Sequence, residues 1–164
     1  MSEISRRSLC IGLPALGMLQ ALAAGAQNPP ISIAKNPAEP HPGNALHTDL
    51  SQCMAFPETQ MHLRYSDAGA PTRDILRGTV PTGEMVELHR TTLTPGMMPH
   101  PAHQHPHEEF LLVIAGTVEF FYDGQSHMLE PGSVGYVAPN QIHGFRNAGK
   151  TEAQYFIVSL SKKY

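Results

Sequence analysis

The 164-residue chain contains no tryptophan, only two cysteines and few charged side chains, which make up 15% of the residues. This composition argues against a coiled coil and against a chain that its charge keeps disordered. The 11 basic side chains do not outnumber the 14 acidic ones, and the formal net charge is −3. No basic surface for nucleic acid is therefore expected. The 15 prolines and 14 glycines instead favour short strands joined by frequent turns.

Several catalytic motifs are also missing from the sequence. It has no glycine-rich nucleotide loop, no Gly-x-Ser-x-Gly nucleophile elbow and no basic cradle for phosphate. Histidine, in contrast, occurs ten times. Because imidazole is the commonest metal ligand, the chemistry of this chain is expected to depend on a metal ion.

The first 26 residues read as a cleavable export signal. Arg6 and Arg7 precede an apolar run from Leu9 to Ala24, and the small residues 24–26 form a typical cleavage site. The run is short and interrupted, so we expect no stable membrane insertion after cleavage, a retained anchor being the alternative. The arginine pair resembles a twin-arginine signal, with Sec export as the alternative. Both routes predict a periplasmic or secreted protein.

The cysteines do not predict a disulfide. Cys10 would leave with the signal, and Cys53 would then be the single cysteine of the mature chain. A nucleophilic role for Cys53 needs a nearby base that the sequence does not show, and the alternative is a small apolar or surface residue.

The remaining chain divides into an arm and one domain. Residues 27–59 are rich in proline and are expected to form an arm outside the domain, with no site of its own. Residues 60–164 are expected to form one all-β barrel domain with antiparallel strands, because strand-like runs alternate there with turn signals such as Asp123-Gly124. The expected strands are Gln60–Ser66, Gly83–Leu93, Glu108–Ala115, Thr117–Tyr122, Ser126–Leu129, Val134–Val137, Gln141–Phe145 and Ala153–Leu160.

One of these strands is apolar on both of its faces. The run Phe110–Ile114 contains only apolar residues, which suits a strand that is covered by the core on one side and by a second layer on the other. The second layer could be another subunit. We therefore expect a homodimer in which this strand or the arm is covered by the partner.

A dense histidine cluster supplies the candidate site. His103, His105 and Glu109 share one parity in an extended strand, with the two histidines about 6.6 Å apart along it. A fourth donor must come from another strand, and His143 at the start of an apolar run qualifies. The neighbours His100, His107 and Glu108 are expected at the surface or behind the ligands.

The spacing of these residues resembles the two motifs of the cupin superfamily. The first motif fits from Gly96 to Gly116 with one extra residue before His103. The second fits from Gly132 through His143 to Asn147. Two positions depart from it, with Ala138 and Asn140 standing where the family usually has Pro and Gly. Asn tolerates the left-handed backbone that a turn glycine would adopt.

The resemblance implies a double-stranded β-helix barrel with His103, His105, Glu109 and His143 as metal ligands at one mouth. Three imidazoles and a carboxylate leave open positions on an octahedral ion, which favours Mn, Fe or Ni over Zn.

Cupins with this ligand set include dioxygenases, so we expect a metal-dependent dioxygenase that acts on a small oxygen-bearing molecule. Glu109 or Glu108 could serve as its general base. The aromatic candidates for lining its pocket, which could equally be core residues, are Phe120, Tyr122, Tyr136 and Phe145. The alternatives are a cupin isomerase or lyase, and a non-catalytic module that binds a metal, a sugar or a small acid.

Overall fold

The computed structural model describes residues 29–33 and 48–162. The predicted export signal, residues 1–26, and the arm residues 34–47 lie outside the described residues. The described chain contains one short 3-10 turn, η1 (Glu58–Gln60), and is otherwise built from strands and loops. No helix in these ranges is long and apolar enough to cross a membrane.

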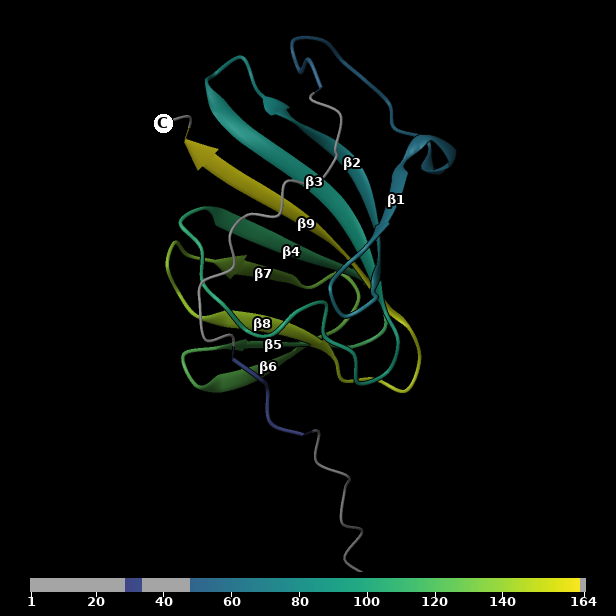
Figure 1. Ribbon diagram of the computed structural model, residues 1–164, viewed down its shortest axis with the longest axis vertical. Helices are drawn as coiled ribbons and strands as arrows, with labels where there is room; N and C mark the ends of the chain where they lie inside the picture. Colours follow the sequence, from purple (N-terminus) through teal and green to yellow (C-terminus); the bar gives the residue numbers. More distant parts are fainter. Residues whose placement is uncertain (1–28, 34–47, 163–164) are drawn as a thin grey trace, which may run out of the picture.

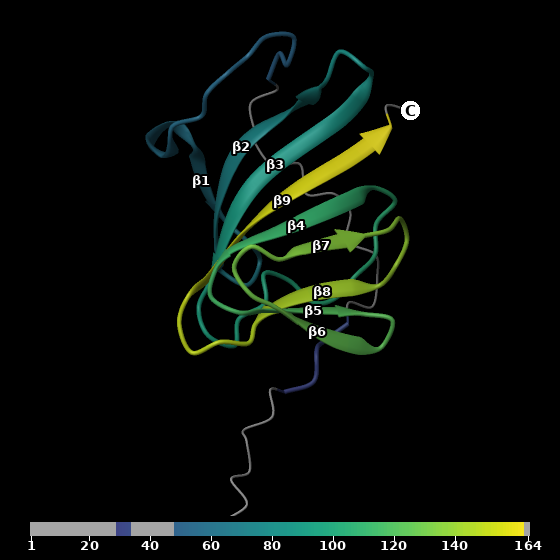
Figure 2. The same ribbon diagram turned by 180° about the vertical axis from the view of Figure 1, so that it is seen from behind.

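Two antiparallel sheets make up the barrel (Figures 1 and 2). The six-stranded sheet has the order β1 (His62–Tyr65), β2 (Pro71–Thr79), β3 (Glu84–Leu93), β9 (Ala153–Lys162), β4 (Glu108–Ala115) and β7 (Val134–Val137). The three-stranded sheet has the order β6 (Gln125–Leu129), β5 (Val118–Tyr122) and β8 (His143–Asn147). Neighbouring strands in both sheets pair antiparallel, which confirms the predicted all-β, antiparallel domain.

The core fills the space between the two sheets. The ring of Phe120 on β5 lies against Gly135 on β7, where an added Cβ would approach it to 3.0 Å. The rings of Phe145 on β8 and Tyr155 on β9 have centroids 5.9 Å apart. Buried and more exposed residues alternate along β7 and the first part of β9, as a sheet with one covered face requires, whereas all five residues of β8 are buried.

Strand β2 is absent from the set of strands that the sequence predicts. Its inward side chains include Thr72, Asp74 and Arg77, and the register shifts between Asp74 and Leu76. A polar inward face and a bulge together remove the alternation of apolar and polar residues on which a strand prediction depends.

Two turns show why glycine is needed where it occurs. At the hairpin between β5 and β6, Asp123 and Gly124 have φ values of 50° and 70°, and two positive φ angles suit a tight two-residue hairpin turn. Gly116 follows β4 with φ 71°, and an added Cβ there would lie 2.7 Å from the Cα of Ala153. Any side chain at Gly116 would push apart β4 and the start of β9.

The described parts of the arm contact the barrel. The Ala102 amide donates a hydrogen bond to the Ser32 carbonyl over 2.7 Å, and the Arg146 guanidinium donates to the Pro29 carbonyl. Further along the chain, the Thr48 amide donates to the Arg77 carbonyl over 2.8 Å. These segments lie outside both sheets, and the course of the arm as a whole stays a prediction.

The outer face of the six-stranded sheet carries an apolar patch around β4 and β7. Leu112 pairs with Val134, and Phe110 pairs with Tyr136 at a ring distance of 5.3 Å. Leu112, Val134 and Tyr136 are 36, 59 and 50% exposed. Contiguous apolar surface of this kind is typical of contacts between proteins. Homodimerisation stays a prediction, and this patch is the surface on which we expect the partner.

A double variant, Val134→Lys/Tyr136→Lys, should shift the protein from dimer to monomer, because it would bury two ammonium groups in the contact. Light scattering coupled to gel filtration measures the change. The matched control is Met128→Lys, which replaces an exposed apolar residue on β6 of the other sheet. This change should leave the oligomeric state unaltered. A wild-type protein that stays monomeric at high concentration would contradict the prediction.

Candidate metal centre

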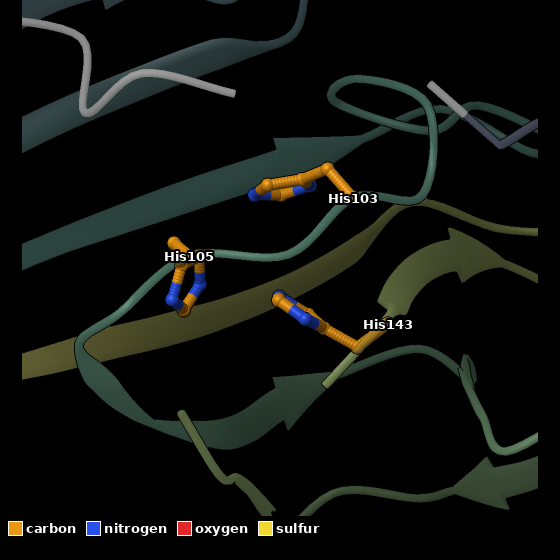
Figure 3. A group of neighbouring side chains, drawn as sticks. All are labelled: His103, His105 and His143. Carbon is orange, nitrogen blue, oxygen red and sulfur yellow. The ribbon is translucent and has the colours of Figure 1, made fainter. Parts of the chain in front are cut away.

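Three imidazoles meet at one mouth of the barrel (Figure 3). His103 and His105 lie on the loop before β4, and His143 begins β8. One ring nitrogen from each histidine lies within 4.8 Å of the others. The backbones of His103 and His143 are joined by two hydrogen bonds of 2.9 Å, which link the loop to the start of β8.

The loop differs from the extended strand that the sequence suggested. Strand β4 begins only at Glu108, and the segment before it contains isolated bridges at Ala102 and His103. Pro101 and Pro106 flank the two histidines and have no N–H to donate to a ladder, so a continuous strand does not form there. His103 and His105 still direct their rings toward the same centre, with centroids 5.3 Å apart.

Backbone carbonyls orient all three rings. Nδ1 of His103, His105 and His143 lies 3.3, 2.9 and 2.9 Å from the carbonyl oxygens of Pro101, His107 and Gln141, respectively. A carbonyl can only accept, so each Nδ1 carries a proton, and in the neutral imidazole Nε2 then keeps a free lone pair. Nε2 of His105 and of His143 is buried and has no hydrogen-bond partner. The arrangement presents neutral nitrogen donors, which is the form that binds metals.

Glu109 completes the group from the start of β4. Its carboxylate oxygens lie 3.4 Å from Nε2 of His105 and 3.8 Å from Nε2 of His143. Ser159 on β9 donates a hydrogen bond to the same carboxylate over 3.2 Å. Burial would raise the pKa of Glu109, but the adjacent imidazoles of His105, His107 and His143 hold that pKa well below 4.5. Glu109 therefore stays an anion beside the three rings.

The histidine pKa values are shifted in the direction that favours metal binding. Burial, followed by the nearby histidines, lowers the pKa of His103 to about 3. Burial also lowers the pKa of His143 below 6.5. The imidazole of His103 therefore remains neutral in mildly acidic solution, and a metal ion would not have to displace a proton from it.

His107 lies closer to the centre than a surface residue would. Its ring stacks on that of His105 at 3.5 Å, and its Nε2 is 3.1 Å from a Glu109 oxygen. His105, His107 and Glu109 together form a second group of side chains that could hold a metal ion. The ring of His100 contacts His103 edge-on at 4.2 Å. Glu108 pairs with Leu160 on the strand positions that face away from the barrel interior.

The four aromatic residues proposed to line a pocket occupy different places. Phe120 and Phe145 are buried in the core, 4 and 3% exposed. Tyr136 lies on the outer face of the sheet and does not line the barrel interior. Tyr122 stacks on His127 at 4.6 Å. Sequence reasoning also missed Ser159, because its contact with Glu109 depends on the pairing of β9 with β4.

The depressed pKa of His103 predicts an acid dependence of stability for the metal-free protein. Between pH 6.5 and about 3 the unfolded chain binds a proton at His103 that the folded chain does not bind. The free energy of unfolding should therefore fall as the pH falls, by up to about 1.4 kcal/mol per pH unit for such a group. Urea unfolding in the presence of a chelator measures the free energy of unfolding between pH 6.5 and 4.5. Its slope against pH should be shallower for His103→Asn than for the wild type. An unchanged slope would contradict this assignment.

Comparisons with known proteins agree with the geometry. Residues 79–159 match the family model described as Cupin domain. No curated protein matches the sequence. Many solved structures are similar, and three of them share 15 to 22% sequence identity with the chain, a level at which the likeness concerns the fold.

A predicted oxalate decarboxylase from Thermotoga maritima is 16% identical, with 65% of this chain and 98% of that chain covered and a TM-score of 0.55. A Cupin 2 conserved barrel domain protein from Salinispora arenicola is 22% identical, with coverages of 66 and 89% and a TM-score of 0.53. The polyketide cyclase RemF from Streptomyces resistomycificus is 15% identical, with coverages of 69 and 87% and a TM-score of 0.53. Sequence motifs and fold agree, and the chain belongs to the cupin superfamily.

Proposed function

We propose that the protein is a metal-dependent enzyme that acts on a small oxygen-bearing organic molecule, with a dioxygenase reaction as the leading case. One observation carries the proposal. Nε2 of His105 and of His143 is buried without a hydrogen-bond partner, and both atoms face the anionic carboxylate of Glu109. Buried polar atoms without partners cost about 1 to 3 kcal/mol each, and a bound cation would remove that cost.

The donor set suits a transition metal with open positions. His103, His105 and His143 would supply three nitrogens and Glu109 one oxygen, which leaves two positions on an octahedral ion. Zinc prefers four ligands in a tetrahedron and would be saturated by them, so Mn, Fe or Ni fits better. When bound, such an ion supplies a Lewis acid with exchangeable positions and, for Fe or Mn, a redox centre.

The protein's own groups hold this donor set in place. Three backbone carbonyls fix the proton on Nδ1 of each imidazole, and Ser159 and His107 fix the carboxylate of Glu109. Because its pKa lies well below the usual value, Glu109 is a weak base. This favours its role as an anionic ligand over the general-base role that the sequence also suggested for it.

A non-catalytic metal-binding module is the second candidate, and the burial of the site favours it. The side chains of His143 and His105 are 1 and 3% exposed, whereas those of Glu109 and His107 retain 13 and 17%. A molecule could reach the centre from the side of Glu109 and His107. The similar solved structures carry names as different as oxalate decarboxylase and polyketide cyclase, so the fold does not select a reaction.

Metal stoichiometry tests the ligand assignment without any assay of activity. The wild type should retain about one equivalent of Mn, Fe or Ni after dialysis, measured by plasma mass spectrometry. The double variant His103→Ala/His105→Ala should retain none, because two donors cannot replace four. His127→Ala is the matched control, since it removes a histidine from β6 and should leave the metal content unchanged. Stoichiometric metal in the double variant would overturn the assignment.

Oxygen uptake separates the enzyme from the binding module. The metal-loaded protein is mixed with a panel of phenols, diketones and small acids in an oxygen electrode, and products are followed by mass spectrometry. We expect uptake with at least one class, and loss of that uptake in the double variant. A protein that binds metal stoichiometrically but neither consumes oxygen nor converts any member of the panel would favour the binding module.

A further inference from the structure

The inner face of the six-stranded sheet continues as a polar row beyond the metal centre. Register pairs place Glu109 on β4 beside Ser159 on β9, Ser159 beside Glu87 on β3, and Glu87 beside Arg77 on β2. Neighbouring strands are about 4.8 Å apart, so Glu87 lies about 10 Å from Glu109 along this row. A small molecule bound at the metal centre that spans this distance would reach Glu87.

A buried carboxylate lies next to this row. Asp74 on β2 pairs with His89 on β3 and is only 5% exposed. Its Oδ1 accepts a hydrogen bond of 2.8 Å from Nε of Arg64, which reaches over from β1. Its Oδ2 lies 3.6 Å from Nδ1 of His62, and Nδ1 of His89 lies 3.6 Å from a Glu87 oxygen. Both contacts are too long for a hydrogen bond, and both Asp74 Oδ2 and His89 Nδ1 are buried. Partnerless polar atoms at this depth are uncommon unless a ligand or water engages them.

The two arginines of the group are held by their Nε atoms. Arg64 uses Nε toward Asp74, and Nε of Arg77 lies 3.8 Å from Glu87. Neither contact uses the terminal Nη groups, and the two side chains are 26 and 27% exposed. Burial would raise the pKa of Glu87, but His89, Arg77 and Arg64 together lower it below 4.5. The acids therefore orient the two guanidinium groups through their Nε atoms.

We propose that Arg64 and Arg77 form the docking site for a carboxylate of the molecule that binds at the metal centre. The proposal rests on the proposed function and deepens it, since it names an organic acid as the ligand class. A guanidinium edge with two parallel N–H donors matches the two oxygens of a carboxylate. Asp74 and Glu87 balance the two arginine charges, which disfavours a dianion such as phosphate. A divalent ion beside Glu109 would leave one positive charge to attract a carboxylate.

Matched acids and amides test the docking site. The probes are glutarate, adipate and benzoate, each compared with its neutral amide, and binding to the manganese-loaded and the metal-free protein is measured by calorimetry. We expect at least one acid to bind at least tenfold more tightly than its amide. Arg77→Gln and Arg64→Gln should each weaken that acid at least tenfold and leave the metal content unchanged.

Arg73→Gln is the matched control. Arg73 lies on the same strand but on the opposite face, with its Nε 3.3 Å from Glu58, and its replacement should not change acid binding. A second readout is the broadening of the acid's proton resonances by bound Mn(II), which should be retained in Arg73→Gln and lost in Arg77→Gln.

Three outcomes would overturn the docking site. They are equal binding of acids and amides, unchanged acid binding in a folded Arg77→Gln variant, and a loss of unfolding free energy in that variant as its only effect. The last result would show that the arginines stabilise the fold by linking neighbouring strands and do not bind the acid. A protein that fails to bind metal but still prefers acids in the metal-free form would contradict the proposed function and leave the docking site standing.

Discussion

The structure depends on the pairing of β9 with β3 on one edge and with β4 on the other. This strand joins β1, β2 and β3 to β4, which carries Glu109 of the metal centre. Because its inward residues lie in register with both neighbours, Ser159 stands between Glu109 on β4 and Glu87 on β3. The distance between the metal centre and the arginines is therefore set by the spacing of paired strands, which is among the least variable distances in proteins.

The sequence predicted what is encoded locally. The hairpin at Asp123-Gly124 and the cluster around His103, His105 and Glu109 depend on residues close together in the chain, and turn chemistry and motif spacing were enough to find them, although the two histidines lie on a loop and not on the expected strand. His143 was found by its place in a second motif. Strand β2 and Ser159 could not be found in this way. The inward face of β2 is polar, and the contact of Ser159 with Glu109 joins residues 50 positions apart.

Four buried side-chain atoms of the described residues have no hydrogen-bond partner, and they fall into two places. Nε2 of His105 and of His143 belongs to the metal centre, whereas Asp74 Oδ2 and His89 Nδ1 belong to the neighbouring group on β2 and β3. The net free energy of unfolding of a domain of this size is small, so buried polar atoms without partners are a substantial cost. Sites where a fold departs from full polar satisfaction are often the sites where it binds something. Glu109 of the metal centre lies on the same inner sheet face as Asp74 and His89.

The contacts of the arm have a consequence for how the chain tolerates change. Arg146 and the Ala102 amide both donate to backbone carbonyls, of Pro29 and Ser32. A backbone oxygen is present whatever the side chain, so most substitutions in residues 29–33 would preserve these acceptors. A deletion would remove them and leave the guanidinium of Arg146, only 4% exposed, with the carboxylate of Glu119 as its remaining partner. In this segment, the number of residues is constrained more strongly than their identity.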